Sequence, residues 1–154
     1  MDVQYDGIDA RLLRHVQADA RLSVAELSER VNLSPSACHR RLQRLERQGV
    51  IRGHVALVEP RAVGRPVTVF VEISLASQAD EVLDAFEAAA AAIPDVLECH
   101  LMTGAYDYLL KVVARDSEDF ARIHRRHLAS LPGVAKLQSS FALKTVCATT
   151  ALPV

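Results

Sequence analysis

Apolar residues in the first third of the chain recur every three or four positions, in three separate stretches. They are Ile8, Leu12, Leu13 and Val16 in the first stretch, Val24, Leu27 and Val31 in the second, and Cys38, Leu42 and Leu45 in the third. Residues at this spacing share one face of an α-helix, whereas strand residues would alternate singly. The pattern therefore predicts three short amphipathic helices whose apolar faces pack together.

The residues between the second and third stretches predict a tight turn. Asn32 tolerates the left-handed backbone conformation that such a turn needs, and Ser34 followed by Pro35 is a favourable start for a helix. Gly49 is a favourable stop, and residues 50–58 are rich in β-branched side chains and predict a short strand. The whole segment is predicted to be a winged-type helix-turn-helix.

The third helix turns polar and basic side chains away from its apolar stripe. At about 100° per residue, its outer face holds Ser36, His39, Arg40, Gln43, Arg44 and Arg47. Small polar residues allow close approach to a DNA groove, and arginine binds guanine edges or phosphates through two parallel hydrogen bonds. Such a face suits the major groove of DNA. The alternative is an ordinary helix pair with a solvated basic surface.

The charge of the chain is distributed unevenly. The 154 residues carry 18 basic and 19 acidic side chains, a net charge of −1. Between positions 30 and 54, however, six arginines stand against a single acid, Glu46, so this stretch is basic and the remainder is acidic. A basic patch on an acidic protein steers a polyanion to one face, which favours nucleic acid as a partner.

From residue 67 onward the pattern alternates between strands and helices. It predicts strands at 67–75, 96–102, 106–114 and 134–146, and helices at 80–92 and from Asp116 or Ser117 to Leu131. The order β-α-β-β-α-β is that of the ferredoxin-like fold, an antiparallel sheet with two helices on one face. The sequence thus predicts an α+β protein with a helix-turn-helix domain and a ferredoxin-like domain.

Two prolines and a glycine in residues 60–66 predict a hinge between these parts. The expected divisions are a helix-turn-helix domain at 1–59, the linker 60–66 and a ferredoxin-like domain at 67–154. The three cysteines, Cys38, Cys99 and Cys147, are widely spaced, and no apolar run is long enough to span a bilayer. We expect a cytoplasmic protein without disulfides.

Several short motifs, taken in order, resemble the Lrp/AsnC family of bacterial and archaeal transcription regulators. In the N-terminal half the matching segments are residues 8–13, 19–23, 33–41 and 45–53. In the C-terminal half they are residues 94–99, 103–110, 131–134 and 149–154. Each motif alone is weak evidence, but together they cover nearly the whole chain.

The resemblance implies a DNA-binding domain joined to an effector-binding domain that forms dimers and often tetramers or octamers. It also implies a free amino acid as the effector, bound where the sensing domains of neighbouring dimers meet. The family's glycine turn corresponds to residues 104–107, where backbone N–H groups can hold a carboxylate and Asp107 an ammonium group. The expected effector contacts are Met102, Thr103, Gly104, Tyr106 and Asp107, with Ser139, Ser140, Thr149 and Thr150 as weaker candidates.

Three positions depart from the family pattern. Ala105 replaces a common Asp in the turn, which removes an acidic group that could hold the ligand. His54 stands where Tyr is frequent, and Cys147 where Lys is frequent. An amino-acid sensor or architectural DNA-binding protein with a weak or lost effector response is therefore the alternative function. Leu101 and Met102 beside the turn favour an apolar effector such as leucine, methionine or phenylalanine.

Other classes of protein fit the sequence less well. An enzyme would have to use His100, Tyr106, Asp107, Tyr108, His124 or His127. On a strand, however, Asp107 points away from both neighbouring tyrosines, and no nucleotide-binding or nucleophile motif is present. His124 and His127 share a helix face, but arginines surround them, so we expect neither a metal nor a cofactor. A stand-alone amino-acid sensor would not need the arginine-faced helix.

We therefore expect a sequence-specific DNA-binding transcription regulator that responds to an amino acid. Ser36, Arg40 and Arg44 are expected to read base edges, and Ser34, Arg41 and Arg47 to contact phosphates, with His39 on the same face. A dimer would set its two recognition helices on half-sites roughly 34 Å apart, one turn of DNA. The expected partners are double-stranded DNA, the effector and further copies of the chain, without a membrane.

Overall fold

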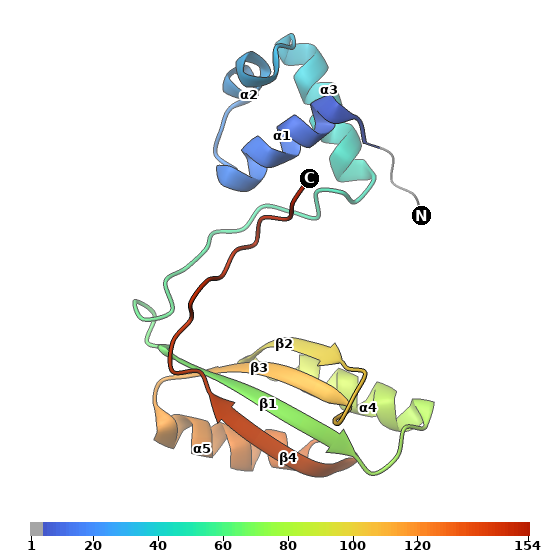
Figure 1. Ribbon diagram of the computed structural model, residues 1–154, viewed down its shortest axis with the longest axis vertical. Helices are drawn as coiled ribbons and strands as arrows, with labels where there is room; N and C mark the ends of the chain where they lie inside the picture. Colours follow the sequence, from blue (N-terminus) through green and yellow to red (C-terminus); the bar gives the residue numbers. More distant parts are fainter. Residues whose placement is uncertain (1–4) are drawn as a thin grey trace. The chain divides into compact units, whose positions relative to one another are not determined.

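The computed structural model describes residues 5–154, which form two compact units (Figure 1). One unit contains the chain through Leu57 together with Cys147–Val154, and the other contains Val58–Val146. The last eight residues thus belong with the helix-turn-helix, which differs from the predicted division at residue 67. Two hydrogen bonds between the Gln17 amide and the backbone of Leu152, of 2.7 and 3.1 Å, hold them there.

Three helices lie in the described part of the first unit: α1 (Gly7–Ala18), α2 (Val24–Val31) and α3 (Pro35–Arg47). Each begins at a side chain that accepts backbone N–H groups of the first turn; these caps are Asp6, Ser23 and Ser34. The caps satisfy donors that a helix start otherwise leaves without a partner. Asn32, at the end of α2, has a φ of 55°. The predicted turn between α2 and α3 is therefore confirmed.

The three helices bury the apolar stripes predicted from the sequence. Leu12, Leu27, Val31 and Cys38 form one cluster, and Leu45 of α3 is also completely buried. Burying a side chain of this size contributes about 1.5–3 kcal/mol. This packing fixes the rotation of α3 about its own axis and so decides which of its residues face outward.

The prediction of a strand at residues 50–58 is wrong, because the structure forms no strand there. α3 ends at Arg47; Gly49, two residues on, has a φ of 72°, and the backbone N–H groups of Val50 and Ile51 donate to the Leu45 carbonyl. The chain then runs extended, with Val55 and Leu57 80% and 76% exposed. β-Branched residues favour an extended backbone, but a strand also requires a hydrogen-bonded neighbour, and the described chain offers this segment none.

The second unit, which is described in full, is an antiparallel sheet covered on one face by two helices (Figure 1). Its strands are β1 (Val67–Leu75), β2 (Val96–Leu101), β3 (Tyr108–Ala114) and β4 (Val134–Phe141), and its helices are α4 (Asp80–Ala91) and α5 (Ser117–Arg126). The strands lie in the order β2-β3-β1-β4, and each neighbouring pair is antiparallel. The predicted ferredoxin-like domain is confirmed.

The core of this unit lies between the sheet and the two helices. Phe86 of α4 and Ile123 of α5 belong to one buried cluster with strand residues, among them Val71 of β1 and Leu110 of β3. Because side chains alternate along a strand, the residues between them, such as Phe70, lie on the opposite, open face of the sheet.

Three element ends differ from the prediction by two residues or more, and those of α4 and β2 by one. β3 begins at Tyr108, because residues 102–107 form the turn that precedes it. α5 ends at Arg126, and a single 3-10 turn, η1 (Leu128–Ser130), takes up the remaining residues. β4 ends at Phe141, opposite Val69, rather than at residue 146; one more hydrogen bond, from the Ala142 N–H to the Thr68 carbonyl, follows, and β1 itself starts at Val67.

Candidate functional site

The outward face of α3 is the first candidate site, and burial of the opposite face defines it. Cys38 and Leu45 are completely buried. Successive residues turn by about 100° around a helix, so residues near 36, 40, 43 and 47 project away from that core. Those exposed on this side are Ser36, His39, Arg40, Gln43 and Arg47. The face therefore presents two exposed guanidinium groups among uncharged hydrogen-bonding side chains.

Two arginines predicted to contact DNA are instead paired with α1. Arg41 donates to Asp9 at 2.9 Å and to Asp6 at 2.7 Å, and Arg44 donates to the other oxygen of Asp9. Asp9 is 0% exposed, and the Nε of Arg44 is buried without a hydrogen-bond partner in the described part of the chain. Arg41 and Arg44 thus join α3 to α1 rather than extend its outer face.

Asp6 completes this cluster at the start of α1. The backbone N–H of Asp9 and, next, the Arg41 side chain lower the pKa of Asp6 to about 2. Asp6 is therefore ionised at neutral pH. Two carboxylates balance two arginines, so the cluster adds no net charge to the surface of this unit.

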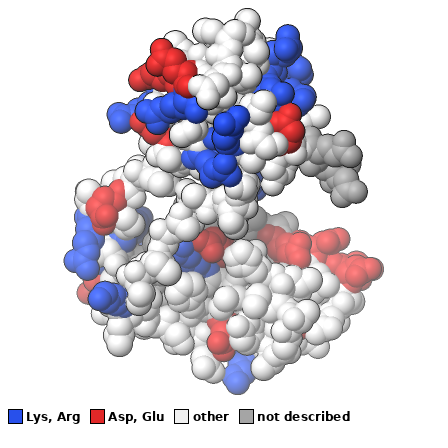
Figure 2. All heavy atoms as spheres, turned by 45° about the horizontal axis from the view of Figure 1, so that its top comes forward, with Lys and Arg blue, Asp and Glu red and all other residues white. Residues whose placement is uncertain are grey.

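The entrance to α3 is polar and open. The Ser34 hydroxyl oxygen accepts the N–H of Ala37 at 3.3 Å and lies 3.2 Å from the hydroxyl of Ser36. Both serines are exposed. Figure 2 shows basic side chains, in blue, gathered over this unit, with acidic ones beside several of them. Ser34 and Ser36 thus lie at the helix N-terminus, where the helix dipole favours a phosphate group.

The second candidate site is a pocket of about 310 Å³ at one end of the sheet. It is lined by Gln78, Leu83, Leu101, Met102, Thr103 and Asp107. These residues come from the β1–α4 connection, from α4, from the end of β2 and from the following turn. The lining combines three apolar side chains with a hydroxyl, an amide and a carboxylate.

Asp107 fixes the shape of this pocket. Its side chain accepts the N–H of Leu75 at 2.7 Å and the amide of Gln78 at 2.6 Å. Its own carbonyl accepts the N–H of Met102 at 2.8 Å, which closes the turn. The carboxylate therefore ties the end of β1 and the β1–α4 connection to the β2–β3 turn.

Gln78 and Leu83 were missed by the sequence reasoning, although the predicted topology contains the signal for them. β1 and β2 are both antiparallel to β3, so both run in the same direction. The segments that follow β1 and β2 must then meet at one end of the sheet. A ferredoxin-like prediction therefore brings residues 76–79 to the β2–β3 turn.

The other predicted effector contacts do not line the pocket. Met102, Thr103 and Asp107 do, whereas Gly104, with a φ of 145°, and the half-buried Tyr106 lie elsewhere in the turn. On β4, Ser139 pairs with Val71 and Ser140 with Phe70, so the two serines face opposite sides of the sheet. Thr149 and Thr150 belong to the first unit.

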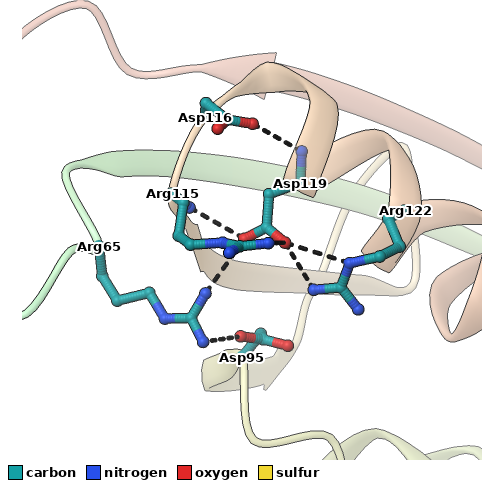
Figure 3. A network of polar contacts seen from close by, with 6 residues as sticks. All are labelled: Arg65, Asp95, Arg115, Asp116, Asp119 and Arg122. Carbon is teal, nitrogen blue, oxygen red and sulfur yellow. Dashed lines mark hydrogen bonds and ion pairs between the residues drawn. The ribbon is translucent and has the colours of Figure 1, made fainter.

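A buried ion-pair network holds the start of α5 (Figure 3). The almost fully buried Asp119 accepts hydrogen bonds from Arg115 at 3.1 Å, from Arg65 at 3.1 Å and from Arg122. Arg65 also lies 3.4 Å from Asp95. The hydrogen bonds from Arg115 hold the pKa of Asp119 well below its ordinary range. Since Arg65 lies in the predicted linker, the network fastens the end of that linker to the second unit.

The remaining ionisable candidates have structural surroundings. Tyr108 is buried in the core and donates its hydroxyl to Glu87 at 2.6 Å; burial and then this bond raise its pKa. Residues 5–154 contain no group of three or more His, Cys, Asp or Glu side chains arranged to hold a metal ion. Within the same residues, no helix is both long and apolar enough to cross a membrane.

Comparison with known proteins matches both units. A family profile described as the Lrp/AsnC ligand binding domain covers residues 68–152, and one described as winged helix-turn-helix DNA-binding covers residues 5–52. The leucine-responsive regulatory protein of Salmonella typhimurium is 40% identical over 141 residues, which cover 92% of this chain and 86% of that protein. The uncharacterized HTH-type transcriptional regulator y4sM of Sinorhizobium fredii is 47% identical over 118 residues, 77% of this chain and 93% of that one.

Solved structures agree over nearly the full length. The transcriptional regulator NMB0573 of Neisseria meningitidis, solved in complex with L-Met, has a TM-score of 0.92 and 39% identity over 97% of both chains. An AsnC family transcriptional regulator from Agrobacterium tumefaciens has a TM-score of 0.93 and 40% identity, again over 97% of both chains. The chain thus belongs to the Lrp/AsnC family of DNA-binding transcription regulators, which are not enzymes and join a winged helix-turn-helix to a ligand-binding domain.

Proposed function

We propose that this regulator responds to an amino acid with an apolar side chain, bound in the pocket at the end of the sheet. The mixture of apolar and polar side chains in the pocket lining carries the proposal. Leu83, Leu101 and Met102 would enclose the side chain of the ligand, while Thr103 and Asp107 would face its charged groups. The volume, about 310 Å³, lies at the lower end of the range for small-molecule sites, roughly 300–1,000 Å³.

Asp107 remains able to take part despite its two hydrogen bonds. A carboxylate offers about four acceptor positions, and Leu75 and Gln78 use two of them. An ammonium group could use the others. The L-Met complex of the Neisseria regulator, a relative of similar fold, supports an amino acid of this kind.

Thermal unfolding in the presence of single amino acids tests the proposal. A ligand that binds only the folded state stabilises it by mass action. At 100 times its Kd, the free energy of unfolding rises by about 2.7 kcal/mol, and Tm rises with it. We expect L-Met, L-Leu or L-Phe to raise Tm and L-Asp, L-Lys and D-Met to have no effect. A protein that no amino acid stabilises would support the alternative, a DNA-binding regulator without an effector response.

A pair of leucine variants locates the ligand. Leu101→Gln, in the pocket lining, should abolish the rise in Tm that the amino acid causes. Leu97→Gln, on the same strand and 55% exposed but outside the lining, should preserve it. Equal loss in both variants would show that the response depends on the stability of β2 rather than on contact with the ligand.

For DNA, we propose that Ser36 and Arg40 contact base edges, that Ser34 and Arg47 contact phosphates, and that His39 lies at the groove edge. All five are exposed on or beside the outer face of α3, whereas Arg41 and Arg44 are held by α1 and are not included. A cytoplasmic dimer would present two such helices to half-sites roughly 34 Å apart.

Two arginine variants separate these roles. Arg40→Ala should relax the preference at one base pair, at a cost of about 1–3 kcal/mol. Arg47→Ala should weaken binding to all sequences alike and reduce the salt slope by about one. Electrophoretic mobility shifts at several salt concentrations distinguish the two patterns, and a uniform loss in Arg40→Ala would move Arg40 to the phosphate contacts.

A further inference from the structure

The outer face of α3 carries an uncharged side chain, Gln43, between its two exposed arginines in sequence. Gln43 lies about 20° around the helix from Ser36 and about 40° from Arg47. The completely buried Leu45 lies about 160° away on the other side. Gln43 therefore lies as far around the helix from Leu45 as Arg47 does, on the side away from the core, and it is exposed.

The neighbouring arginine cannot easily share this position. Arg44 lies beside Gln43 in sequence, but its guanidinium is paired with the buried Asp9. Moving Arg44 to a base would leave the Asp9 carboxylate with Arg41 alone, and a buried charge that loses a partner is costly. The hydrogen-bonding group available between Arg40 and Arg47 is thus a carboxamide and not a guanidinium.

We propose that Gln43 reads an adenine in the major groove and so sets the sequence preference of this regulator at one base pair. Adenine presents an acceptor, N7, beside a donor, the N6 amino group, and a glutamine amide matches this pair with one donor and one acceptor. Guanine presents only acceptors there, N7 and O6, so the amide oxygen would have no donor to pair with. The inference rests on the proposed contact of the outer face of α3 with base edges.

The position of Arg40 determines where the adenine should lie. Three residues along a helix rise about 4.5 Å, close to the roughly 3.4 Å between successive base pairs of DNA. Gln43 and Arg40 should therefore read adjacent base pairs. The expected half-site has an A·T pair beside the pair that Arg40 contacts.

Selection of binding sites from a random duplex library, with the full-length protein, tests the inference. The wild type should select an A·T pair at one position of each half-site. Gln43→Ala should lose the preference at that position by roughly 5- to 150-fold, the range for one bidentate contact. Gln43→Arg should change it from A·T to G·C. Gln48→Ala, an exposed glutamine beyond the end of α3, is the matched control and should leave the selected site unchanged.

The outcomes separate this inference from the proposal on which it rests. If Gln43→Ala folds, as judged by circular dichroism and Tm, and selects the wild-type site at every position, Gln43 does not read a base. If Arg44→Ala loses the A·T preference while Gln43→Ala keeps it, the contact belongs to Arg44 and the inference is overturned. A wild type that selects no sequence would refute base reading by α3 altogether.

Discussion

Asp9 is the residue on which the pairing of α1 with α3 depends most. It is 0% exposed and accepts hydrogen bonds from both Arg41 and Arg44. Removing one partner of a buried ion pair leaves the other charge uncompensated. We expect Asp9→Ala to lower the free energy of unfolding of the first unit by about 3 kcal/mol, the lower end of the usual range because the arginines are partly exposed.

Urea titration followed by circular dichroism at 222 nm measures this loss. Glu29→Ala is a suitable control, because Glu29 is an exposed acid on α2 of the same unit. Its substitution should change stability by less than about 0.5 kcal/mol. Similar losses in the two variants would mean that the Asp9 cluster contributes no more than a surface charge.

Asp119 should make the second unit sensitive to acid. Hydrogen bonds from Arg115, first of all, hold its pKa in the folded protein below the ordinary 3.8. The folded state thus favours the ionised carboxylate, and the resulting stabilisation is complete above about pH 4 and lost as pH falls below it. The Tm of Asp119→Asn should lie below that of the wild type at neutral pH. The difference in Tm between the two proteins should become smaller as pH falls from about 4 toward 2.

Scanning calorimetry of both proteins across this range measures the difference. Asp6, whose pKa is also lowered, is present in both proteins and cancels from the comparison. A Tm difference that stays constant to pH 2 would show that Asp119 stabilises the unit by its shape and not by its charge.

Individual residues were predictable from the sequence where the cause is local. The caps Ser34 and Asp6 and the turn residue Asn32 depend on backbone groups only two or three positions away. The position of Arg44 was not predictable, because its partner Asp9 lies 35 residues earlier in the chain. A helical wheel shows that Arg44 lies at the edge of the outer face. It does not show that Arg44 pairs with an acid of another helix.

At the scale of elements, the start of β4 depends on Gly133. Its φ is 71°, and a Cβ at this position would lie 2.5 Å from a side-chain methyl of Val82 in α4. Gly64 has the same φ of 71° but nothing within 4 Å of its missing Cβ. Alanine should therefore cause similar backbone strain at both positions, with an added clash only at Gly133.

We expect Gly133→Ala to be less stable than Gly64→Ala by about 1–3 kcal/mol, the usual cost of forcing extra volume into a packed site. Thermal unfolding of the two variants, compared with the wild type, measures this difference. Equal destabilisation would mean that α4 moves aside without cost.

The order of the elements was predictable, and some of their ends were not. Alternation and helical spacing identify β1 and α4 because each buries one face within its own unit. The predicted strand at residues 50–58 and the predicted extension of β4 failed for the same reason. Their residues favour an extended backbone, but whether a strand forms depends on a partner that residue pattern alone does not reveal.

At the scale of the whole molecule, the chain connects its two units twice. It leaves the first unit after Leu57 and returns to it at Cys147. Under the proposed function, a ligand in the pocket at the end of the sheet would therefore be connected to the DNA-binding unit along two covalent routes. The second route was not predicted, because residues 147–154 show no repeating pattern. Thr149 and Thr150 were accordingly expected near the effector, whereas the contacts of Gln17 keep this segment with α1.

Self-association should use the open face of the sheet, which no helix of the second unit covers. Phe70 lies at its centre, 38% exposed and opposite Lys111 and Ser140 on the neighbouring strands. An exposed aromatic ring on a flat sheet is typical of an interface.

We expect the wild type to be at least a dimer in sedimentation velocity at micromolar concentration. Phe70→Glu should be a monomer, because in a dimer two buried carboxylates would face each other across a twofold axis. Ala121→Glu, which adds the same charge to the exposed side of α5, should retain the wild-type mass. If Phe70→Glu also retains it, the copies meet elsewhere, and the exposed segment around Val55 and Leu57 becomes the surface to test.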